Sequence, residues 1–456
     1  MSSDTVYDLA VIGGGSGGVR AARLAGQLGK KVCIIEGQDL GGTCVHRGCV
    51  PKKFMVYASR FTHEFEDAAA YGWTLGEEPT FDWSTLIKNK DKELARLGGL
   101  YRKGLENAGV DVIEGFGSFV DANTIAVGER TIRAKNILVA VGGKPVRLVA
   151  EHTELSISSD EIFHLEALPK RVLVVGGGYI GIEFACLLNL LGSETHLVHR
   201  GPHLLRGFDE ECSEFLAESM REAGVQLHLN DTVTSLRKCP EGTDAVLASG
   251  EEIVVDVVLR ATGRRPNTDR LNLESAGVET GDWGQILVDE KFRTSAKHIF
   301  ALGDVITRME LTPVAIAEAI VFIDELFGAG EKTIDYANIP TAIFSTPTMS
   351  TVGISEEEAW KLGRPLSLFT SSFRPMKQSL SGRAGRSFMK LIVDTESDKV
   401  LGAHMVGEHS GEILQAMAVA IRCGATKKDL DGTIGIHPTA AEEFVQMRSV
   451  TRSSPL

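Results

Sequence analysis

The feature that most constrains the fold of this chain is a glycine motif that occurs twice. In the first copy, Gly13, Gly15 and Gly18 form GxGxxG between an apolar segment and a helix-like segment, and Glu36 ends the next apolar segment. Such a turn lets the backbone approach a pyrophosphate at a helix N-terminus, while the acid binds ribose hydroxyls. Residues 7–37 therefore predict a strand, a turn, a helix and a second strand that together bind a dinucleotide.

The second copy lies near the middle of the chain and comprises Gly176, Gly178 and Gly181. The position that corresponds to the ribose acid holds His199, which is followed by Arg200 and later by Arg206. Guanidinium groups at this place are how such folds select a 2′-phosphate, so the second unit is predicted to prefer NADP over NAD. A solvated basic loop is the alternative. One acidic and one basic copy imply two cofactors, most simply FAD and NADPH.

Composition excludes several classes of protein. The chain has 456 residues and 43% hydrophobic content, enough for large cores, and its net charge of -13 argues against a nucleic-acid partner. The N-terminus lacks a charged-then-apolar signal, and no apolar run reaches the roughly 20 residues that span a bilayer. We therefore expect a cytoplasmic protein with no membrane and no nucleic-acid partner.

Two of the seven cysteines, Cys44 and Cys49, lie close together. A zinc site needs four ligands, and no second ligand pair stands nearby, so redox chemistry is favoured and no metal is expected. A regular helix would hold this pair too far apart for a disulfide, so the segment must be irregular, and Gly48 supplies the freedom. Pro51 suits a first helical turn, which places Cys49 near a helix N-terminus that favours a thiolate. Two buried structural cysteines are the alternative.

Four later segments add predicted elements. Residues 137–145, 257–268 and 298–305 each predict a strand that ends in a glycine-rich turn, although such turns are also typical of ordinary strand ends. In the last of these, Asp304 is placed where a carboxylate would hold a flavin ribityl hydroxyl. Residues 387–425 predict two strands around a polar turn and then an amphipathic helix.

The order of these motifs resembles one family over nearly the whole chain. The motifs are GGGSGG at Gly13, GGTCVHRGCVPKK at Gly41, GGGYIGIE at Gly176, HRGPHLLR at His199, ATGRRPNT at Ala261, FALGD at Phe300, LTPVAIA at Leu311 and GIHPTAAEE at Gly435. As a set they are very specific. The chain resembles the class I pyridine nucleotide disulfide oxidoreductases, and among them it is most similar to the glutathione reductases.

The resemblance implies an α/β fold with two Rossmann-like dinucleotide-binding domains, for FAD and NADPH, and a C-terminal α+β dimerisation domain. The implied boundaries are 1–144 and 267–338 for a discontinuous FAD-binding domain, 145–266 for the NADPH-binding domain and 339–456 for the interface domain.

The resemblance also implies roles at the catalytic centre. Cys49, nearer the flavin, is the charge-transfer thiol, and Cys44 is the thiol that attacks the disulfide substrate. Lys52 and Glu183 stand beside the flavin ring. Tyr179 covers the nicotinamide pocket.

A histidine supplies the proton chemistry that the resemblance implies. His437 matches the family acid, and histidine titrates in the useful range. Glu442 would orient and charge it, although Glu442 also fits a capping box with Thr439 as N-cap. In this family the histidine reaches the active site of the partner subunit, so a homodimer that shares its active sites is expected.

Further positions match the cofactor contacts of the family. Those expected to bind FAD are Gly13, Gly15, Ser16, Gly17, Gly18, Glu36, Gly42, Thr43, Lys52, Gly142 and Asp304. Those expected to bind NADPH are Gly176, Gly178, Tyr179, Ile180, Glu183, His199, Arg200, Arg206, Gly263 and Arg264.

The expected substrate is glutathione disulfide, whose carboxylates require a cationic site. Its expected contacts are Ser16, Arg20, Arg23, Tyr101, His437 and Glu443. A cation at Arg20 argues against the cationic trypanothione. Ile320 departs from the family pattern, because several members have a substrate-binding arginine there.

The implied activity is the NADPH-dependent reduction of glutathione disulfide, which maintains the thiol pool. Three alternatives remain open at this point: a reductase of another low-molecular-weight disulfide, a dihydrolipoamide dehydrogenase and a nonenzymatic flavoprotein.

Overall fold

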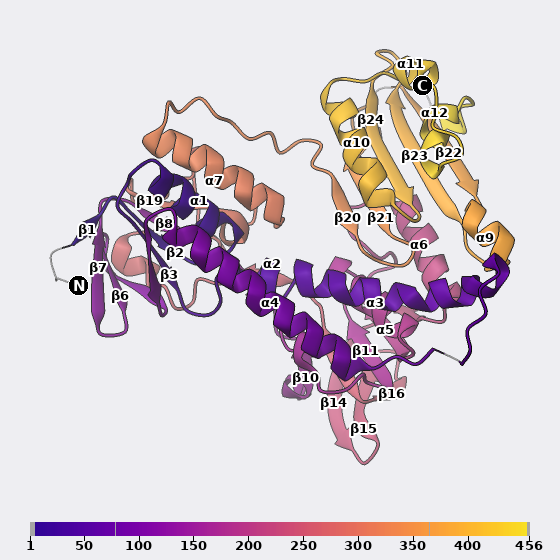
Figure 1. Cartoon of the computed structure of the whole chain (residues 1–456), viewed down its shortest axis with the longest axis horizontal. Coiled ribbons are helices and arrows are strands. Elements are labelled where there is room, and N and C mark those ends of the chain that lie inside the picture. Colours follow the sequence, from indigo (N-terminus) through magenta and orange to yellow (C-terminus); the bar gives the residue numbers. More distant parts are fainter. Residues whose placement is uncertain (1–4, 78, 364, 454–456) are drawn as a thin grey trace.

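The computed structural model describes residues 5–77, 79–363 and 365–453 and arranges them in three units, each built on its own main sheet. In Figure 1 the first unit lies on the left, the second at the lower right and the third at the upper right. Residues 1–4 and 454–456, at the ends of the predicted first and last domains, lie outside the described residues.

The first unit contains a five-stranded parallel sheet in the order β19-β8-β2-β3-β4. Its strands are β2 (Leu9–Ile12), β3 (Val32–Glu36), β4 (Val110–Glu114), β8 (Ile137–Val139) and β19 (Ile299–Ala301). Every residue of β2 and β8 is buried, as expected of a parallel sheet covered on both faces. Helix α1 (Ser16–Gln27) packs on β2 and β3, and α7 (Thr312–Phe327) packs on α1.

A smaller sheet and three helices complete the first unit. The sheet has the order β1-β7-β6-β5, with β1 (Val6–Tyr7), β5 (Gly117–Asp121), β6 (Thr124–Val127) and β7 (Arg130–Ala134). The helices are α2 (Gly42–His46), α3 (Cys49–Ala68) and α4 (Trp83–Glu106). Figure 1 shows α3 and α4 crossing the middle of the molecule, so that they connect the first unit to the other two.

The second unit repeats the same plan with a parallel sheet in the order β10-β17-β11-β12-β13. Its elements are β10 (Ser156–Ser158), β11 (Arg171–Val175), α5 (Tyr179–Leu190), β12 (Glu194–His199), α6 (Glu210–Glu222), β13 (Gln226–Leu229) and β17 (Val257–Arg260). An antiparallel sheet of β14 (Val233–Cys239), β15 (Gly242–Leu247) and β16 (Glu252–Val255) lies beside it. The predicted strands before the turns at 137–145, 257–268 and 298–305 are thus confirmed as β8, β17 and β19.

The chain leaves and re-enters the first unit through a two-stranded ribbon. Here β9 (Gly143–Pro145) pairs antiparallel with β18 (Arg264–Pro266). The second unit is therefore an insertion whose two ends are neighbours. This pairing supports the predicted boundaries near 144 and 266, which we keep as a proposal.

The third unit is a sheet in the order β20-β21-β24-β23-β22-β25, in which all neighbours are antiparallel. Its strands are β20 (Thr341–Ile343), β21 (Met349–Gly353), β22 (Leu366–Phe373), β23 (Ser387–Asp394), β24 (Val400–Val406) and β25 (Arg452–Ser453). Its helices are α8 (Glu356–Trp360), α9 (Met376–Ser381), α10 (Ser410–Arg422), α11 (Lys427–Gly432) and α12 (Glu443–Gln446). Strands β23 and β24 and helix α10 confirm the two strands and the helix predicted for residues 387–425.

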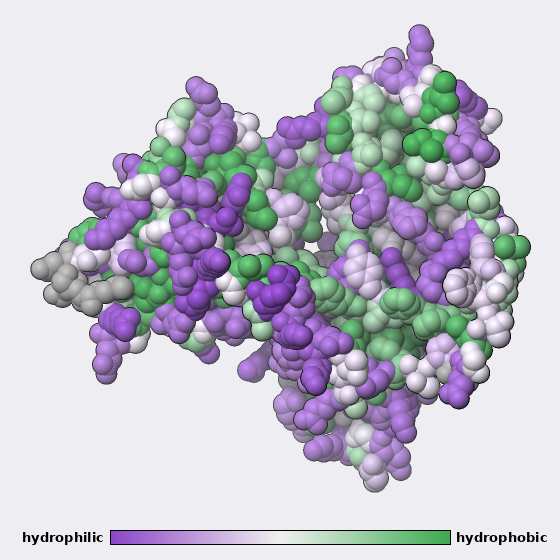
Figure 2. Space-filling model, in the orientation of Figure 1, coloured by the Kyte–Doolittle hydropathy of each residue, from purple (hydrophilic) through white to green (hydrophobic). Residues whose placement is uncertain are grey.

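The observed fold confirms the predicted class: two α/β units with parallel sheets, followed by an α+β unit. In the part of the chain that the structure describes, no helix is both long and apolar enough to cross a membrane. Figure 2 shows polar and apolar residues intermixed over the visible face, with pale green, apolar residues along the right-hand side where α3 runs. The exposed aromatic residues on α3 are Tyr57, Phe61 and Phe65.

Candidate active site

The two glycine motifs form the same turn. Gly13 has φ +106° and Gly176 has φ +127°, a left-handed backbone that glycine adopts without strain. A Cβ on Gly13 would lie 2.4 Å from the carbonyl oxygen of Ala140, and one on Gly176 would lie 2.2 Å from that of Ala261. Each turn therefore packs directly on the next strand end of its sheet, which only glycine permits.

The middle glycine of each motif instead faces open space. A Cβ on Gly178 would meet nothing within 4 Å, and one on Gly15 would meet only Gly42 Cα at 4.0 Å. Both turns lead directly into a helix, α1 or α5, whose free N–H groups favour an anion. The two cradles thus fit the pyrophosphate groups of two dinucleotides.

The residue at the end of the second strand differs between the units. Glu36 accepts hydrogen bonds from the backbone N–H of Gly14 at 2.6 Å and of Gln38 at 2.7 Å. In the second unit, His199 Nδ1 accepts from the N–H of Gly177 at 3.2 Å. The equal spacing from the glycine motifs thus identified structurally equivalent positions, which hold the carboxylate of Glu36 in the first unit and the imidazole of His199 in the second.

A basic loop follows His199 in the second unit. Arg200 and Arg206 are both exposed, and among the described residues neither has an ion-pair partner. Leu205 fixes the loop, because its side chain is buried and its N–H donates to Gly177 O at 2.8 Å. The loop therefore presents two uncompensated guanidinium groups beside the second glycine turn, a good fit for a 2′-phosphate.

The cysteine pair lies where two helices meet. Cys44 is in α2 and Cys49 is the first residue of α3, with Gly48 between the helices as N-cap. The irregular segment and the helix N-terminus predicted at Cys49 are both confirmed. Both thiols are free in this structure.

The pKa values of the two thiols are shifted in opposite directions. The pKa of Cys49 is lowered to about 6, chiefly because the Cys44 thiol donates a hydrogen bond to it. Thr312 and Lys52 lower it further, while burial opposes the shift. The same hydrogen bond, together with burial, raises the pKa of Cys44. Cys49 is therefore the thiolate of the pair and Cys44 keeps the proton.

An ion pair stands beside these thiols. Lys52 Nζ lies 2.7 Å from Glu183 Oε1, and both side chains are largely buried. The same carboxylate oxygen accepts from the N–H of Phe344 at 2.8 Å, and the Phe344 ring lies 4.3 Å from Lys52 Nζ. Burial raises the pKa of Glu183, and Lys52 opposes that shift. The structure thus joins two residues from the first and second units as the sequence predicted.

Three of the cofactor residues predicted from the sequence lie where a strand or a helix begins or ends. Tyr179 begins α5 and is 41% exposed, so its side chain is accessible to a ligand. Asp304 follows β19, and burial raises the pKa of its carboxyl group, a cost that a ligand hydroxyl would offset. Arg264 begins β18 and donates to the carbonyl oxygen of Gly143.

The remaining predicted cofactor residues lie at the starts of helices or directly before strands. They are Ser16, Gly17 and Gly18 at the start of α1, Gly42 and Thr43 at the start of α2, Gly142 before β9, Ile180 in α5, and Gly263 before β18.

His437 and Glu442 form the predicted pair in the third unit. His437 Nδ1 lies 3.1 Å from Glu442 Oε1 and 3.2 Å from Oε2, and the imidazole is 79% exposed. Glu442 also accepts from the N–H of Thr439 at 3.3 Å, which confirms the capping box, while its role toward His437 stays a prediction. Figure 1 shows α12, which comes directly after this pair, far from α2. Within one subunit the imidazole and the cysteines are therefore apart.

The predicted substrate residues lie on three elements. Ser16, Arg20 and Arg23 are on α1, Tyr101 is on α4 and Glu443 is on α12. Each of these side chains is at least partly accessible to solvent. Ile320 is half-buried on α7. The carboxylate of Glu443 accepts from the Ser371 hydroxyl at 3.0 Å.

Sequence patterns missed two residues of the site. Thr312 Oγ1 lies 3.9 Å from Cys49 Sγ, and Phe344 holds Lys52 and Glu183. Phe344 lies in no motif. Thr312 lies within the motif at Leu311, but its partner is far away in the sequence, so spacing alone gave no signal.

Comparisons with known proteins agree with this arrangement. Residues 7–319 match the family of pyridine nucleotide-disulphide oxidoreductases, and residues 339–448 match the dimerisation domain of the same family. Among solved structures, the Cu(II) complex of the HOCl-induced flavoprotein disulfide reductase RclA from Escherichia coli has a TM-score of 0.89 at 25% identity, covering 98% of this chain and 100% of that one.

Three curated relatives carry the same name. Glutathione reductase of a Nostoc species is 48% identical over 97% of this chain and 99% of its own length. The chloroplastic/mitochondrial glutathione reductase of Pisum sativum is 47% identical over 98% and 83%. That of Burkholderia cepacia is 44% identical over 97% and 98%. The chain therefore belongs to the pyridine nucleotide-disulphide oxidoreductase family, within the group of the glutathione reductases.

Proposed function

We propose that this protein is a flavoprotein that uses NADPH to reduce glutathione disulfide to two molecules of glutathione. The observation that carries the proposal is the thiol pair, in which Cys49 has a pKa of about 6 and stands beside the buried Lys52–Glu183 pair. A perturbed thiol in such surroundings is typical of a redox site. The names of the three curated relatives support the substrate.

The two glycine turns would hold the two cofactors. FAD would lie on the turn of Gly13 to Gly18 with its ribose at Glu36, and NADPH on the turn of Gly176 to Gly181 with its 2′-phosphate at Arg200 and Arg206. When bound, they supply a hydride acceptor and a hydride donor, and so the electron pair that reduces a disulfide. Lys52 and Glu183 would fix the edge of the flavin site through their mutual ion pair.

The cysteines carry out the exchange with the substrate. Cys44, once deprotonated, attacks one sulfur of glutathione disulfide, forms a mixed disulfide and displaces one glutathione thiolate. Cys49 then attacks the Cys44 sulfur, so that the second glutathione leaves and the Cys44–Cys49 disulfide forms. The dithiol is oxidised and the substrate is reduced by the same electron pair. The low pKa of Cys49 suits its role as the second nucleophile.

His437 would move the protons of this exchange. It would take the proton of Cys44 and give it to the first departing thiolate, while Glu442 stabilises the imidazolium. Because His437 lies apart from the cysteines of its own chain, we assign it to the active site of a second subunit. The dimerisation domain matched at residues 339–448 and the exposed aromatic residues of α3 support a homodimer.

The substrate would be held by residues from both subunits. Ser16, Arg20, Arg23 and Tyr101 would come from one subunit, and His437 and Glu443 from the other. We also propose a cytoplasmic location, which cell fractionation with an antibody against the protein would test, since the pea relative is described as chloroplastic/mitochondrial.

The direct test is the oxidation of NADPH by the purified yellow protein with glutathione disulfide. Trypanothione disulfide, lipoamide and coenzyme A disulfide serve as parallel substrates. We expect a clear preference for glutathione disulfide. Flavin reduction with faster turnover of another disulfide would move the function to that thiol, and flavin reduction without turnover of any disulfide would support a nonenzymatic flavoprotein.

A variant separates the two halves of the reaction. We expect Cys44→Ser to abolish turnover of glutathione disulfide while NADPH still reduces the flavin in a stopped-flow experiment. A Cys423→Ser variant is the matched control, because Cys423 is exposed at the end of α10 and has no proposed role. Normal turnover by Cys44→Ser would contradict the assignment.

A further inference from the structure

A buried ionic cluster joins the second unit to the third, and the proposed reaction does not use it. Lys390 on β23 is 0% exposed, and its ammonium group pairs with three carboxylates. The Nζ atom lies 2.8 Å from Asp209 Oδ2, 3.1 Å from Glu211 Oε2 and 2.5 Å from Glu356 Oε2. Arg452 on β25 also pairs with Glu211 and Glu356. We call these five residues the Lys390 cluster.

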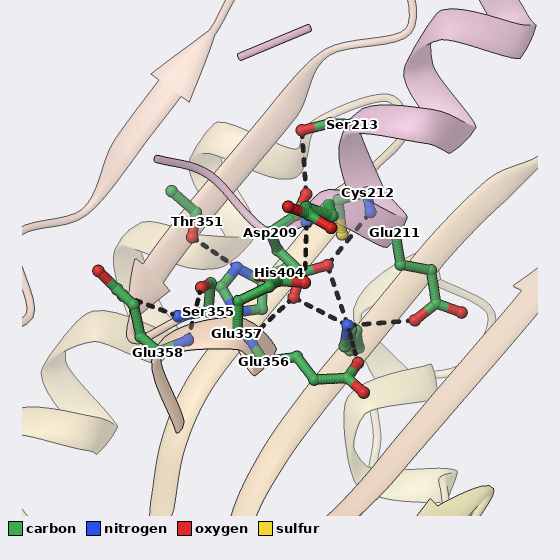
Figure 3. Close-up of polar contacts among 12 residues, drawn as sticks. Asp209, Glu211, Cys212, Ser213, Thr351, Ser355, Glu356, Glu357, Glu358 and His404 are labelled. Atoms are coloured by element: carbon green, nitrogen blue, oxygen red, sulfur yellow. Dashed lines mark hydrogen bonds and ion pairs between the residues drawn. The ribbon is translucent and has the colours of Figure 1, made fainter. Parts of the chain in front are cut away.

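The cluster spans two units of the fold. Figure 3 shows Asp209 and Glu211 at the start of α6, whereas Glu356 comes from the third unit. Burial would lower the pKa of Lys390, but the surrounding carboxylates raise it, so Lys390 stays charged. The contact between the units is thus ionic, with Lys390, Asp209 and Glu356 buried and with Glu211 and Arg452 partly exposed at its edge.

The neighbouring histidine does not supply this charge. His404 lies beside Lys390 in the strand register and is 1% exposed. Its two ring nitrogens already face the Thr351 hydroxyl and the Ile354 carbonyl, at 2.5 Å and 3.1 Å. Burial lowers the pKa of His404, which opposes a charge on its ring, whereas the Lys390 ammonium group contacts Asp209 directly at 2.8 Å. Lys390 is therefore the cation that faces Asp209.

Asp209 also caps the N-terminus of helix α6. It is the N-cap of α6, where its Oδ1 accepts from the N–H of Cys212 at 3.2 Å, and it is 0% exposed. Its Oδ2 accepts from the N–H of Glu356 at 3.2 Å, which adds a direct hydrogen bond to the third unit. The start of α6 is consequently held to the third unit by the fully buried Asp209, with the more exposed Glu211 beside it.

This fixed point stands directly after the basic loop. Arg206 precedes Asp209 by three positions in the chain. On its other side, Leu205 is held by its hydrogen bond to Gly177, and Phe208 N–H donates to Leu205 O at 3.0 Å. Arg206 therefore lies between two anchors, the glycine turn of its own unit and the Lys390 cluster.

We propose that Lys390 is a positioning residue for cofactor selection: from the third unit it holds Asp209, and through Asp209 it sets the place of Arg206 at the 2′-phosphate. The inference rests on the proposed function, because the place of Arg206 matters only if a 2′-phosphate binds there. It assigns part of the preference for NADPH to a residue that is not in the nucleotide-binding unit.

The test is equilibrium binding to the holoenzyme, measured by calorimetry. Adenosine 2′,5′-bisphosphate is the probe with the 2′-phosphate, and ADP is the probe without it. The variants are Lys390→Met, Asp209→Asn and the double variant. Asparagine retains the N-cap. The double variant removes both charges, so it is expected to fold even if Lys390→Met, which leaves a buried carboxylate unpaired, does not.

We expect each variant to weaken binding of the bisphosphate about fivefold and to leave binding of ADP unchanged. The double variant should lose no more affinity for the bisphosphate than the more weakly binding of the two single variants. Both substitutions act through the same ion pair, so their effects should not add. Glu218→Gln is the matched control, since Glu218 is exposed on the same helix and its one ion pair within residues 5–77, 79–363 and 365–453 is with Arg221, at 3.2 Å. It should change neither affinity.

Two other outcomes are separable. If the unaltered protein prefers the bisphosphate and the folded Asp209→Asn and double variants keep that preference, the positioning role is wrong while the proposed function stands. If the unaltered protein binds both probes equally, the proposed use of NADPH fails, and the inference fails with it.

Discussion

Among single side chains, the hydrogen bond between the two cysteine thiols decides which sulfur reacts at which step. It leaves the negative charge on Cys49 and the proton on Cys44. In the proposed reaction Cys44 must therefore lose its proton when substrate arrives, and this is the proton that we assign to His437. Two thiols with the same pKa would not determine which sulfur carries the proton and which carries the charge.

The titration of Cys49 follows from this assignment. Its pKa is lowered to about 6, so the thiolate is present above that pH and is lost as the pH falls through it. We expect the rate of alkylation of the reduced protein by iodoacetamide to fall below about pH 6.

The hydrogen-bond donor is the control for this titration. With Cys44→Ala the main cause of the shift is gone, so the midpoint should move upward. A midpoint that stays in place would show that the Cys44 thiol does not stabilise the thiolate.

Sequence predicted most of the residues that stand in motifs, but it missed Thr312 in the motif at Leu311 and Phe344 outside every motif. Cys44, Cys49 and the Lys52–Glu183 pair were found because their neighbours carry spacing signals. Phe344 was not, because a backbone N–H donor to Glu183 depends on how the third unit packs and leaves no trace in residue type.

Among turns and helices, the two glycine turns differ in the residues at and after the end of the second strand. The first unit has a carboxylate bound to its own turn, whereas the second has a histidine in that place and a basic loop after it. Both turns begin at a glycine with positive φ and lead into a helix, so we assign the choice of cofactor to these side chains.

The basic loop makes a prediction about cofactor choice. We expect Arg200→Gln and Arg206→Gln each to raise the KM for NADPH about tenfold or more, since each removes a charge-assisted hydrogen bond. The KM for NADH should change little. Arg221→Gln, on the exposed side of α6, is the matched control. Equal effects on both cofactors would argue against recognition of a phosphate.

Helices α1 and α7 make a prediction about the substrate. Because Ile320 offers no charge, we assign recognition of a glutathione carboxylate to Arg20 on α1. Arg20→Met should raise the KM for glutathione disulfide about tenfold with little change in kcat.

Adding Ile320→Arg on α7 to the Arg20 variant should recover part of that loss. Arg102→Gln serves as a control, because Arg102 pairs with Glu114 at the surface. If Arg20→Met leaves the KM unchanged, another group holds the carboxylates.

In the complete protein, the sequence motifs predicted the order of the units, but not the contacts between them. The family motifs lie in cofactor turns and in the histidine segment, so they report which units are present. The Lys390 cluster lies outside every motif, and its five members come from four separate segments. Only the packed structure brings them together.

The separation of His437 from the cysteines makes a prediction about the dimer. Homodimers of Cys44→Ser and of His437→Gln should each be nearly inactive. When the two are dissociated, mixed in equal amounts and reassociated, half of the dimers are mixed and each has one complete site. We therefore expect about a quarter of the original activity to return.

Two controls define the outcome of this mixing experiment. Each variant dissociated and reassociated alone should stay inactive. Absence of any recovery from a mixture that contains mixed dimers would place His437 at the cysteines of its own chain.

The ribbon of β9 and β18 has a consequence for how the chain is made. Strand β19 lies next to β8 in the first sheet, but the whole second unit is translated between them. A ribosome therefore releases a complete nucleotide-binding unit while the first sheet still lacks an edge strand. Because β9 and β18 pair with each other, the two ends of the insertion lie side by side. The second unit can therefore fold separately, and β19 can then join the first sheet without a large loss of chain entropy.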